Sequence, residues 1–207
     1  MLLSHQFTMN EPTIDPDNFF KTACYFESSL VLVAIAIGWL VDINPFEFIV
    51  FNEQAVINGI MGTLPLCLIF IALNQLQLES LQKIKQVLHS TLGPSLHKRH
   101  WADLFVLAAV AGISEEILFR GVIQPWMENS WGLMAGLLVS SVIFGLVHAV
   151  TALYFIMATA VSIYLGLYLD YDNTRNLLTP IIIHSLYDFF AFVLILYSYR
   201  LEQQKGN

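Results

Sequence analysis

Long apolar segments separated by short polar stretches make up most of the sequence. The apolar segments are 23–41, 56–77, 102–122, 131–149, 151–169 and 178–199. Each is close to the ~20 residues that an α-helix needs to cross a bilayer core. The pattern predicts an all-α, polytopic membrane protein with about six transmembrane helices in one bundle.

Two of these segments lie almost end to end. Residues 131–169 contain no Asp, Glu, Lys or Arg. This region is too long for a single span, so we expect two helices with a tight break near His148–Thr151. The first segment, 23–41, is the weakest of the predicted spans because Glu27 lies in its opening turns.

The polar stretches divide the chain into a short acidic N-terminal tail, 1–22, and a helical membrane domain, 23–207. The tail has no basic region, so it is not expected to be a cleavable signal. Between the second and third spans, apolar residues recur at helical spacing, which predicts a helix lying in the membrane interface and ended by Gly93-Pro94. These apolar residues are Leu81, Ile84, Leu88 and Leu92.

Composition supports the membrane assignment. The chain is 57% hydrophobic and 12% charged, with a net charge of −7, whereas soluble domains are about 25% charged. The four tryptophans fall at or near segment ends, as interfacial anchors do. No basic stripe is present, so the lipid bilayer is an expected partner and a nucleic acid is not.

The distribution of basic residues predicts the orientation of the chain. With six spans, most Lys and Arg residues fall on one side, and Arg120 and Arg175 fall on the other. The positive-inside rule then predicts that both termini lie in the cytoplasm, and we expect the protein to lie in the cell (inner) membrane. The residues on the basic side are Lys21, Lys83, Lys85, Lys98, Arg99, Arg200 and Lys205.

The stretch GISEEILFRGVIQPW, residues 112–126, places Glu115, Glu116 and Arg120 inside an apolar run. Facing lipid, three such groups would cost about 8–10 kcal/mol, so they must turn inward and find partners. Glu116 and Arg120 are four residues apart and can pair on one helical face. Glu115 points about 100° away from Glu116 around the helix and needs another partner.

Candidate partners for Glu115 occur in two other predicted helices. His148 ends the fourth span, with Phe144 one turn before it, while His184 and Asp188 share a face at i, i+4 in the last span. Intramembrane ionisable residues are costly unless they are used. We therefore expect Glu115, His148, His184 and Asp188 to converge on one polar intramembrane site. Glu115 and His148 can meet only if the break near residue 150 is re-entrant.

Two chemistries fit these four groups. A buried carboxylate beside a histidine can activate water, while a second histidine and a carboxyl group stabilise an oxyanion, which together describe peptide-bond hydrolysis. The same four groups also suit zinc, which would lower the pKa of a bound water. The HExxH motif of common zinc proteases is absent from the sequence.

The motifs resemble those of a known family. EEILFRG (Glu115–Gly121) resembles the EExxxR signature of the CPBP family, the CAAX-processing and bacteriocin-processing intramembrane endopeptidases also called Abi proteins. FGLVH (Phe144–His148) is similar to its FxxxH element, and HSLYD (His184–Asp188) to its HxxxN or HxxxD element. The resemblance covers a protease-like core of about 100–198.

The resemblance implies a glutamate-dependent intramembrane endopeptidase acting on a membrane-associated or CAAX-like protein or peptide, with no cofactor expected. It implies that Glu115 and His148 activate water and that His184 and Asp188 hold the oxyanion. Glu116, Arg120 and Phe144 would support the site.

One residue departs from the pattern of the CAAX-processing branch, which has asparagine where this chain has Asp188. An ionised aspartate would repel an oxyanion, so Asp188 is either protonated or orients His184. Two alternatives remain open. One is a metal-dependent intramembrane protease that binds zinc through Glu115, His148, His184 and Asp188. The other is a non-catalytic membrane immunity or scaffold protein.

Overall fold

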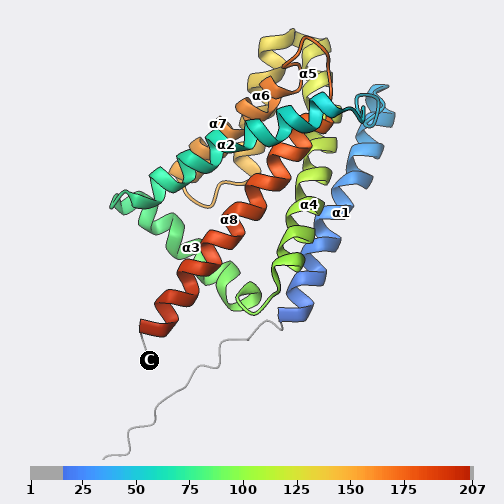
Figure 1. Cartoon of the computed structure of the whole chain (residues 1–207). Helices are drawn as coiled ribbons and strands as arrows, with labels where there is room; N and C mark the ends of the chain where they lie inside the picture. Colours follow the sequence, from blue (N-terminus) through green and yellow to red (C-terminus); the bar gives the residue numbers. More distant parts are fainter. Residues whose placement is uncertain (1–15, 206–207) are drawn as a thin grey trace, which may run out of the picture.

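A computed structural model describes residues 16–205, and this part of the chain is helical without any strand. The fold class predicted from the sequence, an all-α polytopic bundle, is confirmed (Figure 1). In chain order the elements are α1 (Pro16–Val41), α2 (Glu53–Gln75), α3 (Glu79–Leu96), α4 (Trp101–Leu118), the π-helix η1 (Phe119–Ile123), α5 (Gln124–Trp131), α6 (Leu133–Val147), α7 (Ala152–Tyr168) and α8 (Leu178–Lys205).

Three helices within the described residues are long and apolar enough to cross a membrane, namely α1, α2 and α8. The predicted spans 131–149 and 151–169 form separate helices, α6 and α7, which are shorter. At 1.5 Å per residue they extend only about 22 and 25 Å, less than the ~30 Å of a bilayer core. The predicted span 102–122 corresponds to α4 and η1.

The first helix begins earlier than the sequence pattern suggested. The predicted span starts at residue 23, but α1 starts at Pro16, so the second part of the expected tail is helical. Proline is favoured in the first turn of a helix because its missing N–H has no intrahelical partner there. Residues 1–15 of the predicted tail lie outside the described residues.

Helix α8 occupies the middle of the bundle, between α2 and α4 (Figure 1). Helix α1 packs on the other side of α4. The α4–α8 contact is tight at Gly112, where a Cβ atom would lie 2.8 Å from the backbone nitrogen of Ser185. This close approach brings the predicted site residues of α4 and α8 together.

The connection between α6 and α7 lies beside α8, near the middle of the bundle (Figure 1). Close packing of the two helices depends on Gly145, where a Cβ atom would lie 2.9 Å from the Phe155 carbonyl oxygen. Thr151 caps α7, its hydroxyl accepting a hydrogen bond from the Tyr154 N–H at 3.1 Å. The break predicted near His148–Thr151 is therefore confirmed.

Helix α3 corrects one prediction. Gly93-Pro94 does not end the helix, which continues to Leu96. Gly93 instead allows α3 to pass directly against α8, because a Cβ atom there would lie 2.5 Å from the Tyr199 ring. Pro94 lies in the last turn, where its missing N–H removes only one hydrogen bond of the helix.

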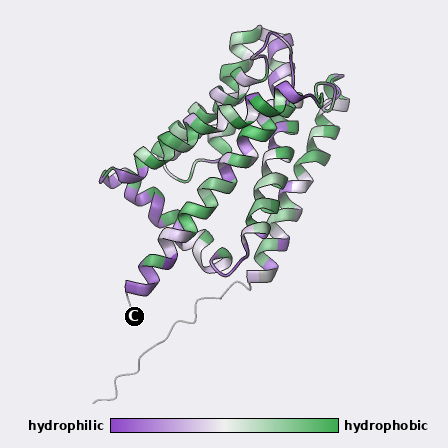
Figure 2. Ribbon diagram, in the orientation of Figure 1, coloured by the Kyte–Doolittle hydropathy of each residue, from purple (hydrophilic) through white to green (hydrophobic). Residues whose placement is uncertain are grey.

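Hydrophilic residues gather toward the two ends of the bundle, in α3, at the end of α8 and in the connections at the opposite end (Figure 2). Exposed large hydrophobic side chains cover the outward faces of α1 and α2, as a lipid-facing surface requires. Trp39, Trp101, Trp126 and Trp131 are all exposed and lie near helix ends. Their predicted positions as interfacial anchors fit this surface.

A cluster of ion pairs between side chains connects the elements at the end of the bundle that lies away from α3. Arg175 pairs with Glu128 of α5 at 2.7 Å and with Asp170 at 2.7 Å. The hydrogen bonds that Arg175 donates to Asp170 raise the pKa of the Arg175 guanidinium further above its ordinary value, so its charge is fixed. The nearby Asn176 side chain donates to the Val50 carbonyl oxygen at 2.9 Å, which joins this end to the α1–α2 connection.

Candidate active site

The two adjacent glutamates of α4 are buried and serve different partners. Glu116 is 0% exposed and Glu115 is 7% exposed. Because successive helical residues point about 100° apart, the Glu116 carboxylate faces Arg120 and α8, whereas that of Glu115 faces the α6–α7 connection. The structure thus separates the two carboxylates in the way that their spacing predicts.

The Glu116 carboxylate connects several helices. Its Oε1 atom accepts hydrogen bonds from Arg120 Nη1 at 2.9 Å and from His184 Nδ1 at 2.8 Å. Arg120 also donates to the carbonyl and hydroxyl oxygens of Ser162 on α7, at 2.7 and 2.9 Å. The buried ion pair is therefore supported by further hydrogen bonds, which a buried charge requires.

The π-helix η1 contains Arg120 and Gly121. π-helical turns are rare and occur frequently at functional sites. Gly121 packs against the α1–α2 connection, where a Cβ atom would lie 2.5 Å from the Pro45 carbonyl oxygen. The sequence pattern gave no sign of a π turn, because its residues fit an α-helix equally well.

His148 follows the last residue of α6, with backbone angles of φ −99° and ψ 4°. Its ring stacks on Phe144 at 4.3 Å between centroids, and its Nδ1 donates to the Phe144 carbonyl oxygen at 2.9 Å. This hydrogen bond fixes the proton of a neutral imidazole on Nδ1 and leaves Nε2 as an acceptor. Nε2 lies 3.5 Å from Glu115 Oε2.

Glu115 Oε2 is buried and has no hydrogen-bond partner within residues 16–205. It faces His148 Nε2, which is also an acceptor in the neutral ring, so a shared proton or a bridging water would satisfy both groups. The predicted meeting of Glu115 and His148 is therefore seen, and it depends on the break between α6 and α7. An unpartnered carboxylate oxygen beside an acceptor histidine is a suitable arrangement for removing a proton from water.

His184 lies between two carboxyl groups. Its Nδ1 donates to Glu116, and its Nε2 lies 3.5 Å from Asp188 Oδ2, one helical turn further along α8. Its ring also meets the edge of Phe144 at 5.9 Å between centroids. Phe144 thus contacts both histidines, and the Arg120 guanidinium lies over its ring at 5.1 Å.

The start of α8 differs slightly from a simple reading of its sequence. A helix beginning at Pro180 with Thr179 as its cap is the natural expectation for TPIIIHSLYD. The helix starts earlier, at Leu178, and the Asn176 side chain accepts a hydrogen bond from the Leu178 N–H at 3.0 Å. Asn and Thr are both favoured helix-capping residues, and the preference for Asn is too small for sequence alone to place the start of the helix.

Sequence reasoning missed two residues near the site. Ser162 is one of the hydrogen-bond acceptors of Arg120, but a serine in an apolar helix carries little signal. Glu27 of α1 lies near enough to Glu115, Asp188, His148 and His184 for their charges to influence its carboxyl group. Its position in an apolar segment was a usable signal, since the cost argument applied to α4 holds for α1 as well.

A metal ion would compete with contacts that the four candidate ligands already make. No group of three or more His, Cys, Asp or Glu residues in the described part of the chain is arranged to hold one. His184 uses one ring nitrogen for Glu116 and turns the other toward Asp188, and His148 uses Nδ1 for the Phe144 carbonyl. Zinc binding through the four predicted residues would require rearranging these contacts, so we derive no step through a metal.

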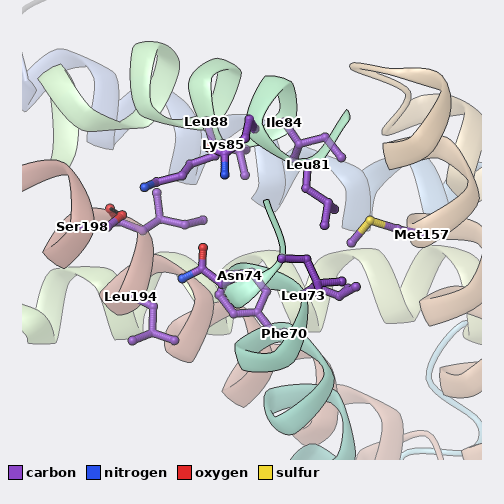
Figure 3. A pocket seen from close by; sticks show the side chains of 13 residues that line it. Phe70, Leu73, Asn74, Leu81, Ile84, Lys85, Leu88, Met157, Leu194 and Ser198 are labelled. Atoms are coloured by element: carbon purple, nitrogen blue, oxygen red, sulfur yellow. Dashed lines mark hydrogen bonds between the residues drawn. The ribbon is translucent and has the colours of Figure 1, made fainter. Parts of the chain in front are cut away.

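An apolar pocket lies apart from these residues, between α2, α3, α7 and α8 (Figure 3). Figure 3 shows Leu73, Leu81 and Met157 turned toward it, with Lys85 at its side. On α8 it is lined by residues from Leu194 onward, about 15 Å along the helix from His184. None of the residues that line this pocket therefore belongs to the polar site.

The fold and the site together define the class of this protein: it is a helical membrane bundle with a buried carboxylate–histidine site. Residues 97–190 match the family model described as type II CAAX prenyl endopeptidase Rce1-like. This stretch, which runs from the approach to α4 into α8, is similar to the Rce1-like family over somewhat less than half of the chain, and the resemblance to CAAX-processing endopeptidases is confirmed. The matched stretch contains all seven residues that the sequence motifs singled out, Glu115, Glu116, Arg120, Phe144, His148, His184 and Asp188.

One curated relative is the uncharacterized protein YpbD of Bacillus subtilis (strain 168), which is 36% identical over 94 residues. The match covers 44% of this chain and 44% of the relative, so it spans less than half of either protein. The comparison with solved structures found no match.

Proposed function

We propose that the protein is an intramembrane endopeptidase that hydrolyses a peptide bond in a membrane-associated or CAAX-like protein or peptide. The observation that carries the proposal is the buried, unpartnered Glu115 Oε2 atom, 3.5 Å from His148 Nε2. The Rce1-like stretch supports the reaction class. Both groups are acceptors, so together they can take a proton from a water molecule held between them.

The reaction uses this water as the nucleophile. Glu115 and His148 remove one proton as the water oxygen attacks the carbonyl carbon of the scissile bond. The resulting oxyanion is stabilised by an N–H of His184, which Glu116 and Asp188 hold in place. The C–N bond then breaks as the proton passes to the leaving nitrogen, and a new carboxyl group, which keeps the second proton of the water, and a new amine are released.

The two acidic groups around His184 have separate roles in this proposal. Glu116, paired with Arg120, orients the ring through Nδ1. Asp188 lies beside Nε2 on the same helix and keeps this nitrogen protonated and directed toward the substrate oxygen. An orienting role for Asp188 removes the need for an acidic group to contact the oxyanion itself.

Cleavage of membrane peptides tests the proposal. Wild-type protein in liposomes is incubated with a library of membrane peptides that includes prenylated CAAX sequences, and new termini are identified by mass spectrometry. Glu115→Gln and His148→Ala are expected to lower the rate at least about 100-fold. Glu79→Gln, an exposed control on α3, keeps the wild-type rate. Wild-type turnover in either site variant would contradict the assignment of these two residues.

The proposal includes no metal requirement. Elemental analysis of the purified protein is expected to show no stoichiometric zinc, and a chelator is expected to leave the cleavage rate unchanged. Stoichiometric zinc together with loss of cleavage on chelation would favour the metal-dependent alternative instead.

A further inference from the structure

Glu27 is a partly buried residue whose carboxyl group the mechanism above does not use. It lies in α1, outside the stretch 97–190 that matches the Rce1-like family. Its Oε2 atom is buried and has no hydrogen-bond partner in the described residues. A carboxyl group in an apolar membrane helix is costly, and an unsatisfied oxygen adds to that cost.

Helical spacing places Glu27 on the inward face of α1. Val31 and Ala34 follow it at i+4 and i+7, and both pack in the core cluster formed around Ile117. Ala34 is 0% exposed. The face that carries Glu27 is therefore the face that α1 turns toward α4.

The packing of α1 against α4 limits the depth at which Glu27 lies. On one side of it along α1, Cys24 packs in the cluster that contains Leu104 and Leu107 of α4. On the other side, Val31 packs in the cluster that contains Ile117. The two helices run in the same direction, so Glu27 lies level with the part of α4 between Leu107 and Ile117, which includes Glu115.

The electrostatic contacts of Glu27 point to the same place. The charged groups near enough to influence its carboxyl group include Glu115 on α4, His148 after α6, and His184 and Asp188 on α8. These are the four residues to which the sequence assigns the chemistry. Cys24 is the other titratable neighbour, on α1 itself.

We propose that Glu27 is a further catalytic residue, which holds the reacting water together with Glu115. The inference rests on the proposed function. A water molecule has two O–H groups, so it can donate one to the acceptor pair formed by Glu115 and His148, which removes that proton, and the other to Glu27, and its lone pairs then point toward the substrate carbonyl. The oxygens of Glu27 and Glu115 that lack protein partners find a common partner in this water.

Substitution of Glu27 tests the inference with two readouts. Glu27→Leu removes the acceptor oxygens, so we expect kcat to fall at least about tenfold while KM changes by less than about twofold. The thermal midpoint in detergent should stay the same or rise, because a buried unpartnered carboxyl group has been removed. Glu27→Gln keeps one acceptor oxygen and should retain a kcat between those of Glu27→Leu and the wild type. Ser28→Leu, on the exposed face of the same turn, should leave kcat unchanged.

An unchanged kcat in Glu27→Leu would overturn the inference. A lower thermal midpoint would overturn it as well, because it would show that Glu27 has a structural partner. Failure of the wild type to cleave any peptide would instead count against the proposed function. In that case, the thermal midpoint of the double variant Glu27→Leu/Glu115→Leu tests the inference without a substrate. If the shift in its midpoint differs from the sum of the shifts in the two single variants, the two residues share a site. If the shift equals that sum, the result contradicts a shared site.

Discussion

At the scale of single residues, the Glu116 carboxylate links the chemistry to the fold. It accepts hydrogen bonds from Arg120 within the same helix and from His184 on α8. Arg120 is 1% exposed and continues the connection to Ser162 on α7. Loss of the charge on Glu116 would leave a buried guanidinium without a counter-charge, which is far more costly than the loss of a surface pair.

Glu116→Gln is therefore expected to lower the free energy of unfolding by about 3–5 kcal/mol. The measurement is equilibrium unfolding in mixed micelles. Glu79→Gln is the matched control, since its partner Lys83 lies 2.9 Å away in an exposed pair, and it should cost less than about 1 kcal/mol. Equal stability of the two variants would mean that Glu116 does not hold the helices together.

The residues that meet at the site could be predicted because charge is expensive in a membrane. That cost alone indicates inward positions for Glu115, Glu116 and Arg120. The particular partner of each nitrogen atom could not be predicted, because it depends on how helices distant in sequence pack. The His184–Glu116 hydrogen bond is such a case, since Asp188 is the obvious partner at i+4 but lies further away.

At the scale of elements, close contact between α4 and α8 sets the geometry of the site. Gly112 lies one turn before the two glutamates, directly against the backbone of Ser185, which follows His184. Any side chain at residue 112 must push α8 away from α4. The hydrogen bond between Glu116 and His184 crosses the same interface, so it would lengthen in consequence.

Gly112→Ala is expected to lower both the thermal midpoint and the cleavage rate, the rate by about tenfold or more, because small displacements of positioned groups are costly in catalysis. Thermal unfolding and peptide cleavage measure the two effects. Ile113→Ala changes the neighbouring, exposed side chain and should affect neither by more than a small amount. A wild-type rate in Gly112→Ala would show that the α4–α8 spacing does not control the site.

Hydrophobic pattern predicts where helices occur more reliably than where they end. The break between α6 and α7 follows from the length of the uncharged region, and the structure has it at the predicted place. The end of α3 was wrongly predicted at Gly93-Pro94, because the glycine serves packing against Tyr199 rather than chain reversal. Local sequence cannot distinguish these two uses of glycine.

At the scale of the whole molecule, basic residues gather at one end of the bundle. Helix α3, the start of α1 and the end of α8 all lie at this end (Figure 1). The residues predicted to face the cytoplasm belong to these elements or to the connection that follows α3. The arrangement supports our proposal that both termini lie in the cytoplasm.

Thiol labelling in intact cells tests this orientation. In a variant with Cys24 and Cys67 replaced by alanine, single cysteines are introduced by Gln86→Cys on α3 and Thr174→Cys in the α7–α8 connection, both at exposed positions. A membrane-impermeant reagent should label the residue 174 variant in intact cells and the residue 86 variant only after lysis. The reverse pattern would invert the proposed orientation.

The central claim is that Glu115 and His148 activate a water molecule for peptide hydrolysis. The most direct measurement is cleavage in water enriched with ¹⁸O, by wild type and Glu115→Gln in liposomes, followed by mass spectrometry of the new carboxyl terminus. We predict that the wild-type product carries one solvent oxygen, about 2 Da heavier per terminus, and that Glu115→Gln forms almost no product, since general-base catalysis contributes about 10²–10⁴-fold. Cleavage by Glu115→Gln at the wild-type rate, or a product without ¹⁸O, would contradict the claim.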